Sequence, residues 1–252
     1  MNKYLVDLFS LKNKIVIVTG GARGNGKAIS EALLKADATV IVVDQLKNEL
    51  TKTVNNFKKL NLDCYEFNCD ITNEHQILKL KKFIKNKFKR IDILINNAGF
   101  SSSNELLTYP EKIWEKTYKI NLKAPYELSK IFAPFMIKQK SGVIINITSL
   151  NSELAFPDNP AYITFKGALK QLSKSLALDL GRYGIRVNNI GPGYFKTKMT
   201  EKSWKDKKLR KMRSQRTVLG RWGKPEDLIG IIICLCSKSS SYITGQDIYV
   251  DG

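Results

Sequence analysis

The chain has 252 residues, 43% of them apolar, which is enough to bury a large core in one domain. His75 is the only histidine and the four cysteines form no Cys-x-x-Cys pair, so a zinc site and a histidine-based triad are excluded and no metal is expected. The net charge of +19 would suit an anionic substrate or cofactor. Aromatic residues do not interleave the basic runs Lys79–Arg90 and Lys202–Arg216, as a stacking surface for bases would require. We therefore expect most of the charge to lie on solvated helix faces and expect no nucleic acid partner.

No segment has the length and apolarity of a membrane helix. The first residues, Met1–Asp7, lack the apolar core of a signal peptide, and the longest apolar stretch, Ile231–Cys236, is far too short to cross a bilayer. We therefore expect a cytoplasmic protein with reduced thiols and no membrane partner.

Short apolar runs alternate with helical patterns along the chain. The runs are continuous rather than alternating, which is typical of parallel strands covered on both faces. They lie at Lys14–Thr19, Thr39–Val43, Cys64–Asn68, Ile91–Ile95, Val143–Thr148, Ile185–Ile190 and Asp247–Val250. Helical patterns lie between them, near 24–36, 47–60, 73–89, 111–139, 160–180 and 225–236.

This order predicts an α/β fold, a doubly wound (Rossmann) parallel sheet of about seven strands with helices on both faces. No Pro/Gly/Ser-rich linker or internal repeat interrupts the series, so residues 1–252 are expected to form a single domain. One irregular, basic insertion, Lys196–Val218, separates a strand from a helix and suits a mobile lid over a substrate.

A glycine-rich turn follows the first expected strand and opens a helix. It reads Thr19-Gly20-Gly21-Ala22-Arg23-Gly24-Asn25-Gly26, which matches Thr-Gly-x-x-x-Gly-x-Gly rather than the stricter Gly-x-Gly-x-x-Gly. Glycines at these positions allow a tight turn and let the helix N-terminus approach a pyrophosphate, although such a turn can also lack a phosphate role.

Asp44 ends the second expected strand, eighteen residues beyond Gly26. A carboxylate there can accept hydrogen bonds from the hydroxyls of an adenosine ribose. It would repel a 2′-phosphate by on the order of 4 kcal/mol at contact, with an effective dielectric constant near 20. Arg23 favours the opposite choice, since its guanidinium could reach that phosphate. We weight Asp44 more heavily and expect NAD, with NADP as the alternative.

Tyr162 and Lys166 lie four residues apart in an expected helix, and Ser149 lies thirteen residues before Tyr162. The spacing places the phenol and the ammonium on one helix face. Acid–base work near neutral pH requires the phenolate to be stabilised by about three pKa units, or roughly 4 kcal/mol, and an adjacent lysine acts in that direction. The three residues together indicate proton transfer to and from an alcohol oxygen.

The whole chain resembles a short-chain dehydrogenase/reductase. Besides the glycine turn, the family's order and spacing are matched by Asp70, Asn96-Asn97-Ala98-Gly99, Asn121, Ser149, Tyr162-x-x-x-Lys166 and Pro192-Gly193-x-x-x-Thr197. The resemblance implies a homotetramer and a catalytic set of Asn121, Ser149, Tyr162 and Lys166, with Asn121 in a water-linked proton relay to Lys166.

The resemblance also implies a set of cofactor-binding residues. Asp70 and Ile71 would contact the adenine, Asn97 would line the cleft, and Phe195 and Thr197 would hold the nicotinamide carboxamide. The full predicted set is Gly20, Arg23, Gly24, Asn25, Gly26, Asp44, Asp70, Ile71, Asn97, Ala98, Gly99, Tyr162, Lys166, Pro192, Gly193, Phe195 and Thr197.

In the expected reaction, hydride moves between NAD and the carbon of a secondary alcohol or ketone. Tyr162 takes the alcohol proton in oxidation and returns it in reduction. Lys166 lowers the pKa of the phenol and can hold the nicotinamide ribose, while the Ser149 hydroxyl fixes the substrate oxygen.

Three segments look most like the branch that contains gluconate 5-dehydrogenases and their deoxygluconate relatives: Ser149–Leu154, Pro192–Thr200 and Gly220–Pro225. That similarity implies a sugar-derived polyol, keto-sugar or aldonate as the substrate. The candidate substrate-binding residues are Ser101, Ser149, Glu153, Tyr162 and Tyr194.

The branch carries arginines shortly after Asn-Asn-Ala-Gly, whereas this chain reads Phe100-Ser101-Ser102-Ser103. Without a bidentate clamp for a carboxylate, a neutral substrate is expected to outperform gluconate, unless Lys196 or Lys198 supplies a point charge.

Two alternatives stay open. Arg23 and the basic surface would suit an NADPH-dependent 3-oxoacyl-acyl-carrier-protein reductase, because the carrier is acidic. A non-catalytic binding or scaffold protein with the same fold is the other, although no structural reason requires all four catalytic residue types at these spacings.

Overall fold

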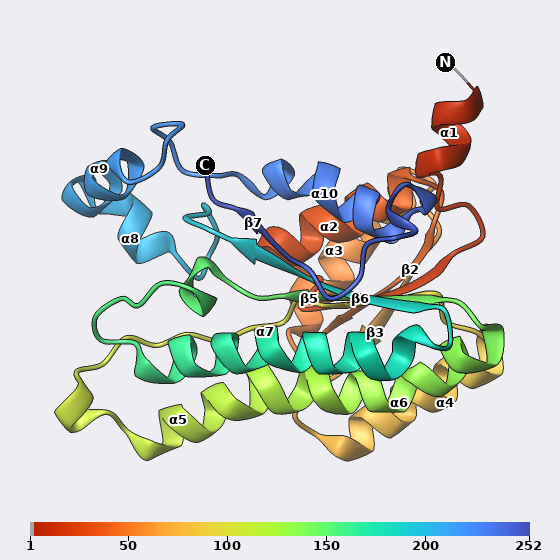
Figure 1. The fold of residues 1–252 in the computed structure, drawn as a ribbon, viewed down its shortest axis with the longest axis horizontal. Coiled ribbons are helices and arrows are strands. Elements are labelled where there is room, and N and C mark those ends of the chain that lie inside the picture. Colours follow the sequence, from red (N-terminus) through yellow and green to blue (C-terminus); the bar gives the residue numbers. More distant parts are fainter. Residues whose placement is uncertain (1–2) are drawn as a thin grey trace.

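The computed structural model describes residues 3–252; Met1 and Asn2, which open the segment examined for a signal peptide, lie outside the described residues. All strands run parallel in one seven-stranded sheet of order β3-β2-β1-β4-β5-β6-β7 (Figure 1), which confirms the predicted α/β class. The strands are β1 (Ile15–Thr19), β2 (Thr39–Asp44), β3 (Cys64–Asn68), β4 (Ile93–Asn96), β5 (Gly142–Ile147), β6 (Ile185–Pro192) and β7 (Asp247–Val250).

The α-helices connect the strands and cover both faces of the sheet. They are α1 (Lys3–Phe9), α2 (Gly24–Lys35), α3 (Lys47–Lys59), α4 (Glu74–Lys87), α5 (Glu111–Tyr118), α6 (Ala124–Gln139), α7 (Pro160–Gly181), α8 (Glu201–Lys205), α9 (Lys207–Gln215) and α10 (Ile229–Cys236). Within residues 3–252, no helix has the length and apolar character needed to cross a membrane.

Two apolar cores lie on the two faces of the sheet. Ile29 and Leu33 of α2 pack in one core with residues of α3 and α10. Leu80 of α4 and Phe132 of α6 belong to the other core, to which α7 also contributes. In Figure 1, α2 and α10 accordingly lie above the sheet and α4, α6 and α7 below it. Burial on both faces explains why the strands are continuously apolar.

A buried polar seam attaches α7 to the sheet. Asn96 Nδ2 donates to Asn146 Oδ1 at 2.8 Å, and Asn146 Nδ2 donates to Ser173 Oγ at 2.7 Å. The Ser173 hydroxyl lies 2.5 Å from Asn189 Oδ1 and 2.9 Å from the carbonyl oxygen of Leu169. This buried network fixes α7 against β4, β5 and β6, which positions the helix that carries Tyr162. One of its atoms, Asn96 Oδ1, has no hydrogen-bond partner among residues 3–252.

Two elements differ from the sequence prediction. The helix expected over 111–139 contains a π-helical turn, Lys119–Lys123, between α5 and α6. The insertion over Lys196–Val218, expected to be irregular, contains α8 and α9. Asp206 is the N-cap of α9, and its side chain accepts a hydrogen bond from the Leu209 N–H at 2.9 Å. This cap supports a mostly basic helix in which no residue is buried.

Candidate active site

A cleft of about 470 Å³ lies at the carboxyl edge of the sheet, around the ends of β1 and β4. The strand order reverses between these two strands, and open α/β sheets bind ligands at such a point. Every residue of the predicted cofactor set lines the cleft. Because the strands are parallel, the segments that follow them all reach this one edge.

The turn between β1 and α2 brings backbone close to backbone. A Cβ atom on Gly26 would lie 2.1 Å from the Gly20 carbonyl oxygen and 2.4 Å from Asn97 Nδ2, so no other residue fits there without displacing the turn. Gly20 and Gly24 have φ angles of +62° and +54°, which glycine adopts without strain. The Asn97 amide donates to the carbonyl oxygens of Thr19 and Gly20, at 2.9 and 3.1 Å, and so joins the loops after β1 and β4.

Asp44 is oriented by the backbone on both sides of its carboxylate. Its Oδ2 atom accepts from the Ala22 N–H at 3.1 Å, and its Oδ1 atom accepts from the Leu46 N–H at 3.0 Å. Each oxygen keeps a lone pair for a further donor. Asp70 is similarly engaged, because its Oδ1 atom accepts from the N–H and hydroxyl of Thr72, at 2.9 and 2.8 Å.

Three features of this part of the cleft fit a nicotinamide adenine dinucleotide. No side chain caps the first turn of α2, so its N–H groups can face a pyrophosphate. Asn25 Oδ1 is buried and has no hydrogen-bond partner among residues 3–252. The carboxylate of Asp44 lies in the lining where ribose hydroxyls would need an acceptor.

Tyr162, Lys166 and Ser149 meet at another part of the cleft lining. Tyr162 and Lys166 lie on successive turns of α7, and Lys166 Nζ is 5.8 Å from the centroid of the Tyr162 ring. The Lys166 side chain is 3% exposed, and its Nζ atom donates to the Ile147 carbonyl oxygen at 2.6 Å. Ser149 follows β5, where its hydroxyl donates to Asn151 Oδ1 at 3.2 Å and also interacts with the phenol of Tyr162.

The pKa shifts in the free chain differ from the sequence expectation that Lys166 lowers the pKa of Tyr162. Burial raises the pKa of the Tyr162 phenol, and the hydrogen bond with Ser149 is what lowers it in part. Burial also lowers the pKa of Lys166 to about 7. The reason is that desolvation disfavours both charged forms, so near pH 7 the lysine is only partly an ammonium.

Asn121 lies in the π-helical turn and is fully buried. Its Oδ1 atom accepts from the Phe100 N–H at 2.9 Å, and its Nδ2 atom donates to the Phe100 carbonyl oxygen at 2.7 Å. A Cβ atom on Gly99 would lie 3.3 Å from Asn121 Oδ1 and 3.8 Å from Lys166 Nζ. Gly99 thus lies close to both Asn121 and Lys166. Asn121 holds the segment after β4, and it is not part of the cleft lining.

Known proteins are similar to this chain in sequence and in fold. A family model described as enoyl-(acyl carrier protein) reductase matches residues 20–252. Gluconate 5-dehydrogenase of Gluconobacter oxydans is 35% identical over 98% of this chain and 96% of its own length. The 3-oxoacyl-[acyl-carrier-protein] reductase FabG of Thermotoga maritima is 36% identical over 96% of this chain and 98% of its own length. The crystal structure of a gluconate 5-dehydrogenase from Burkholderia cenocepacia, in complex with NADP and tartrate, has a TM-score of 0.95 at 31% identity and covers 98% of this chain and 97% of its own.

The chain belongs to the short-chain dehydrogenase/reductase family. It is therefore an oxidoreductase that interconverts a hydroxyl and a keto group with a nicotinamide nucleotide, and its resemblance to the gluconate 5-dehydrogenase branch is confirmed.

Only two of the five substrate residues predicted for this dehydrogenase/reductase, Ser149 and Tyr162, line the cleft. Ser101 lies outside the lining, where its hydroxyl accepts from Asn159 Nδ2 at 2.9 Å. Tyr194 packs between Phe156 and Trp222, with ring centroids 6.2 and 5.7 Å away.

Glu153 also lies outside the lining, and its carboxylate accepts from Lys170 and Tyr249. Glu153, Ser101 and Tyr194 thus each contact a protein partner outside the cleft lining, and their contact with the substrate stays a prediction.

The sequence interpretation missed one cation in the cleft, Lys116 of α5. Its Nζ atom lies 4.3 Å from the centroid of the Phe100 ring, in cation–π contact. Within the described part of the chain Lys116 forms no ion pair, whereas Lys198, which also lines the cleft, lies 2.5 Å from Glu201. No motif marks Lys116; it is one lysine among many in a basic chain, and only the packing of α5 beside Phe100 brings it here.

Proposed function

We propose that this dehydrogenase/reductase oxidises a secondary hydroxyl of a sugar-derived acid, and reduces the corresponding keto acid, with NAD preferred over NADP. The observation that carries the proposal is the joint position of Ser149, Tyr162 and Lys166 in the lining of the dinucleotide cleft. The two gluconate 5-dehydrogenases support the substrate class.

The chain's residues would divide the chemistry as follows. A bound nicotinamide would supply the hydride acceptor for oxidation and the hydride donor for reduction. Tyr162 moves the proton of the substrate oxygen, and Ser149 donates a hydrogen bond to that oxygen as charge develops. Lys166 would hold the nicotinamide ribose; a protonated Lys166 beside the phenol would lower the pKa of Tyr162, opposing the effect of burial.

Lys116 alters the expectation that a neutral substrate is preferred. The arginine clamp is missing from Phe100–Ser103, but Lys116 adds an unpaired cation to the same cleft. A carboxylate that loses water on binding needs a charge-assisted partner, and an ammonium can supply it. We therefore place sugar acids ahead of neutral polyols and keto-sugars.

Asp44 supports NAD as the preferred cofactor. Its carboxylate is fixed by the N–H groups of Ala22 and Leu46, so it cannot turn away easily from a 2′-phosphate. The Burkholderia relative is complexed with NADP, and the preference proposed for this chain therefore rests on its own Asp44. We expect a preference for NAD of at least about tenfold in kcat/KM, and Asp44→Ala to shrink it mainly by improving NADP.

The remaining sequence expectations are part of the same proposal. We propose a single cytoplasmic domain whose segment 196–218 closes over the substrate, assembled as a homotetramer by family resemblance. Thr197 to Thr200 of that segment line the cleft, which supports a lid role. Light scattering of the purified chain tests the tetramer.

A cofactor-reduction screen tests the proposed function. D-gluconate, other sugar acids, neutral sugars and polyols are assayed with NAD and NADP in parallel, on the parent chain and on Lys116→Met. We expect a sugar acid with NAD to give the highest kcat/KM, and Lys116→Met to lower it for acids alone. A neutral polyol as the best substrate would contradict the role of Lys116.

The alternative of an acyl-carrier-protein reductase is favoured by the Thermotoga relative and by the net charge of +19. The discriminating result is a parent chain that prefers NADPH and reduces a 3-oxoacyl thioester faster than any keto-sugar acid.

A further inference from the structure

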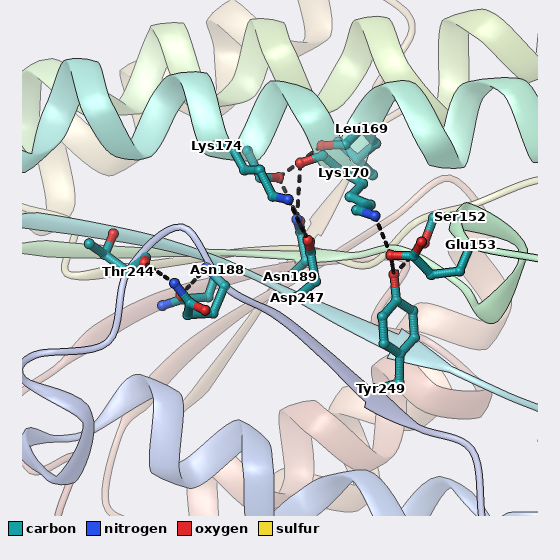
Figure 2. Close-up of polar contacts among 12 residues, drawn as sticks. Ser152, Glu153, Leu169, Lys170, Lys174, Asn188, Asn189, Thr244, Asp247 and Tyr249 are labelled. Carbon is teal, nitrogen blue, oxygen red and sulfur yellow. Dashed lines mark hydrogen bonds and ion pairs between the residues drawn. The ribbon is translucent and has the colours of Figure 1, made fainter.

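A polar cluster outside the cleft joins the segment after β5 to α7 and β7. Figure 2 shows the Glu153 carboxylate between the side chains of Lys170 and Tyr249. Lys170 Nζ and the Tyr249 hydroxyl both donate to Glu153 Oε1, the latter at 2.8 Å. One carboxylate oxygen thus receives donors from a helix and from the last strand.

The cluster reaches the backbone of Ser149 through Ser152. The Ser152 hydroxyl donates to the Ser149 carbonyl oxygen at 2.5 Å and lies 3.1 Å from the Tyr249 hydroxyl oxygen. Tyr249 donates its one hydroxyl proton to Glu153, and its oxygen lies against the neighbouring Ser152, so it contacts two consecutive residues of this short turn. The position of Ser149 depends on a segment that is fastened just beyond it.

Lys170 connects the same cluster to the helix that carries the proton-transfer residue. Tyr162, Lys166 and Lys170 follow at intervals of four residues in α7, so they form one stripe along one helix face. The first two enter the cleft lining, and the third binds Glu153. The Lys170–Glu153 pair thus spans the two elements whose separation sets the distance from Ser149 to Tyr162.

The Glu153 carboxylate keeps its charge at neutral pH. Hydrogen bonds from Lys170 and then Tyr249 lower the pKa of Glu153, so the carboxylate stays ionised at neutral pH. The Lys170 side chain is 19% exposed and the Glu153 side chain is 42% exposed, and an ion pair of that exposure adds little to global stability. Its effect is therefore expected to be local.

We propose that Glu153, Lys170 and Tyr249 form a brace that holds Ser149 in register with Tyr162, and that all three are positioning residues for the reaction. The inference rests on the proposed alcohol–ketone chemistry at Ser149 and Tyr162. A misplacement of about 1 Å at a reacting group can cost on the order of a hundredfold in rate, so a loosened brace should slow turnover without removing any group from the cleft.

Four variants test the brace, with one matched control. Glu153→Gln, Lys170→Met and Tyr249→Phe each break the brace, whereas Lys170→Arg keeps the cation. The control is Lys174→Met, also on α7, which removes a neighbouring ion pair, that of Lys174 with Asp247 of β7 at 3.0 Å. Reduction of 5-keto-D-gluconate, the ketone of gluconate oxidised at carbon 5, is measured with NADH. We expect kcat to fall roughly tenfold in the three breaking variants and to stay near that of the parent in Lys170→Arg. The Kd for NADH and the Tm of the breaking variants should equal those of Lys174→Met.

Two further measurements separate positioning from a general loss of structure. The double variant Glu153→Gln with Lys170→Met should be no slower than either single variant, because both remove one interaction. Hydrogen exchange over residues 149–156 of the free chain should accelerate in the breaking variants and not in Lys174→Met.

The proposal of a brace would be overturned if the breaking variants had the same kcat and the same hydrogen-exchange rates as the control, Lys174→Met. A parent chain without turnover would instead count against the proposed function, while the exchange measurement still tests the brace on the same samples.

Discussion

At the scale of single residues, burial gives Tyr162 and Lys166 opposite pKa shifts. The pKa of the phenol rises and that of the lysine falls to about 7, because burial removes the water that would stabilise the phenolate and the ammonium. Ser149 is the neighbour that offsets the shift at Tyr162, by donating to the phenolate. Near pH 7 the free chain therefore holds Tyr162 as the neutral phenol and Lys166 only partly as the ammonium, and added charge in the cleft shifts their ionisation.

Tyr162→Phe should abolish turnover and leave the fold intact. The change deletes only the hydroxyl that moves the proton, and the ring continues to occupy its place on α7. We expect kcat to fall at least about a thousandfold while the Kd for NADH changes little, measured by steady-state kinetics and fluorescence titration. Turnover near that of the parent would contradict the assignment.

Lys166→Met should change how stability depends on pH. The folded-state pKa of about 7 lies below the ordinary value for lysine, so between about pH 7 and 10 the unfolded chain binds more protons than the folded chain. The parent's free energy of unfolding should therefore rise with pH over that window by more than the variant's does. Denaturant unfolding of both proteins from pH 6 to pH 10 measures the difference, and parallel curves would show that Lys166 titrates normally.

At the scale of elements, the turn between β1 and α2 and the π-helical turn before α6 depend on close approach. The first brings Gly26 against the Gly20 carbonyl oxygen. The second places Asn121 where both polar atoms of its amide bind the Phe100 backbone. Interruptions of a regular helix of this π type often mark functional sites, and here it stands between α5, which carries Lys116, and α6.

Gly26→Ala should impair both folding and cofactor binding. The new Cβ would lie 2.1 Å from a backbone oxygen that cannot move without opening the turn, so we expect a loss of about 1–3 kcal/mol in stability and a weaker Kd for NADH. The matched control is Gly230→Ala in α10, which meets no atom within 4 Å and should be stabilised by about 0.5–1 kcal/mol. Equal Tm shifts in the two variants would show that the turn tolerates a side chain.

At the scale of the whole molecule, the net charge of +19 surrounds a cleft proposed to take an anionic substrate. A positive field raises the encounter rate of anions, and salt screens it over a Debye length of about 10 Å at 0.1 M. The charge is spread mostly over lysines on solvated helices, so this effect concerns association rather than the chemical step.

Salt should therefore discriminate between substrates. We expect kcat/KM for D-gluconate to fall severalfold when ionic strength rises from about 0.01 to 0.2 M, whereas kcat/KM for a neutral polyol stays nearly constant. Both are measured at one saturating NAD concentration, so that salt effects on cofactor binding cancel. An equal response of the two substrates would assign the +19 charge no role in substrate capture.

The sequence by itself determined the sheet and the edge at which the chemistry gathers. Continuous apolar runs between helical patterns define parallel strands, and parallel strands bring the glycine turn, Asp44, Asn97 and Ser149 to one edge whatever the details of packing. The four-residue spacing of Tyr162 and Lys166 fixes their common face in the same local way. The glycine turn and Asp44 were predictable for this reason, whereas the family resemblance implied the rest of the cofactor set.

Tertiary structure alone decided which polar side chains face the cleft and what charge they carry. Glu153 follows Ser149 closely in sequence, yet it turns to Lys170 and Tyr249, partners 17 and 96 residues away. Lys116 enters the cleft because α5 packs beside Phe100, and Lys166 loses its ordinary pKa because distant elements exclude water from it. Orientation and desolvation depend on contacts between segments far apart in the chain, and a local pattern does not encode them.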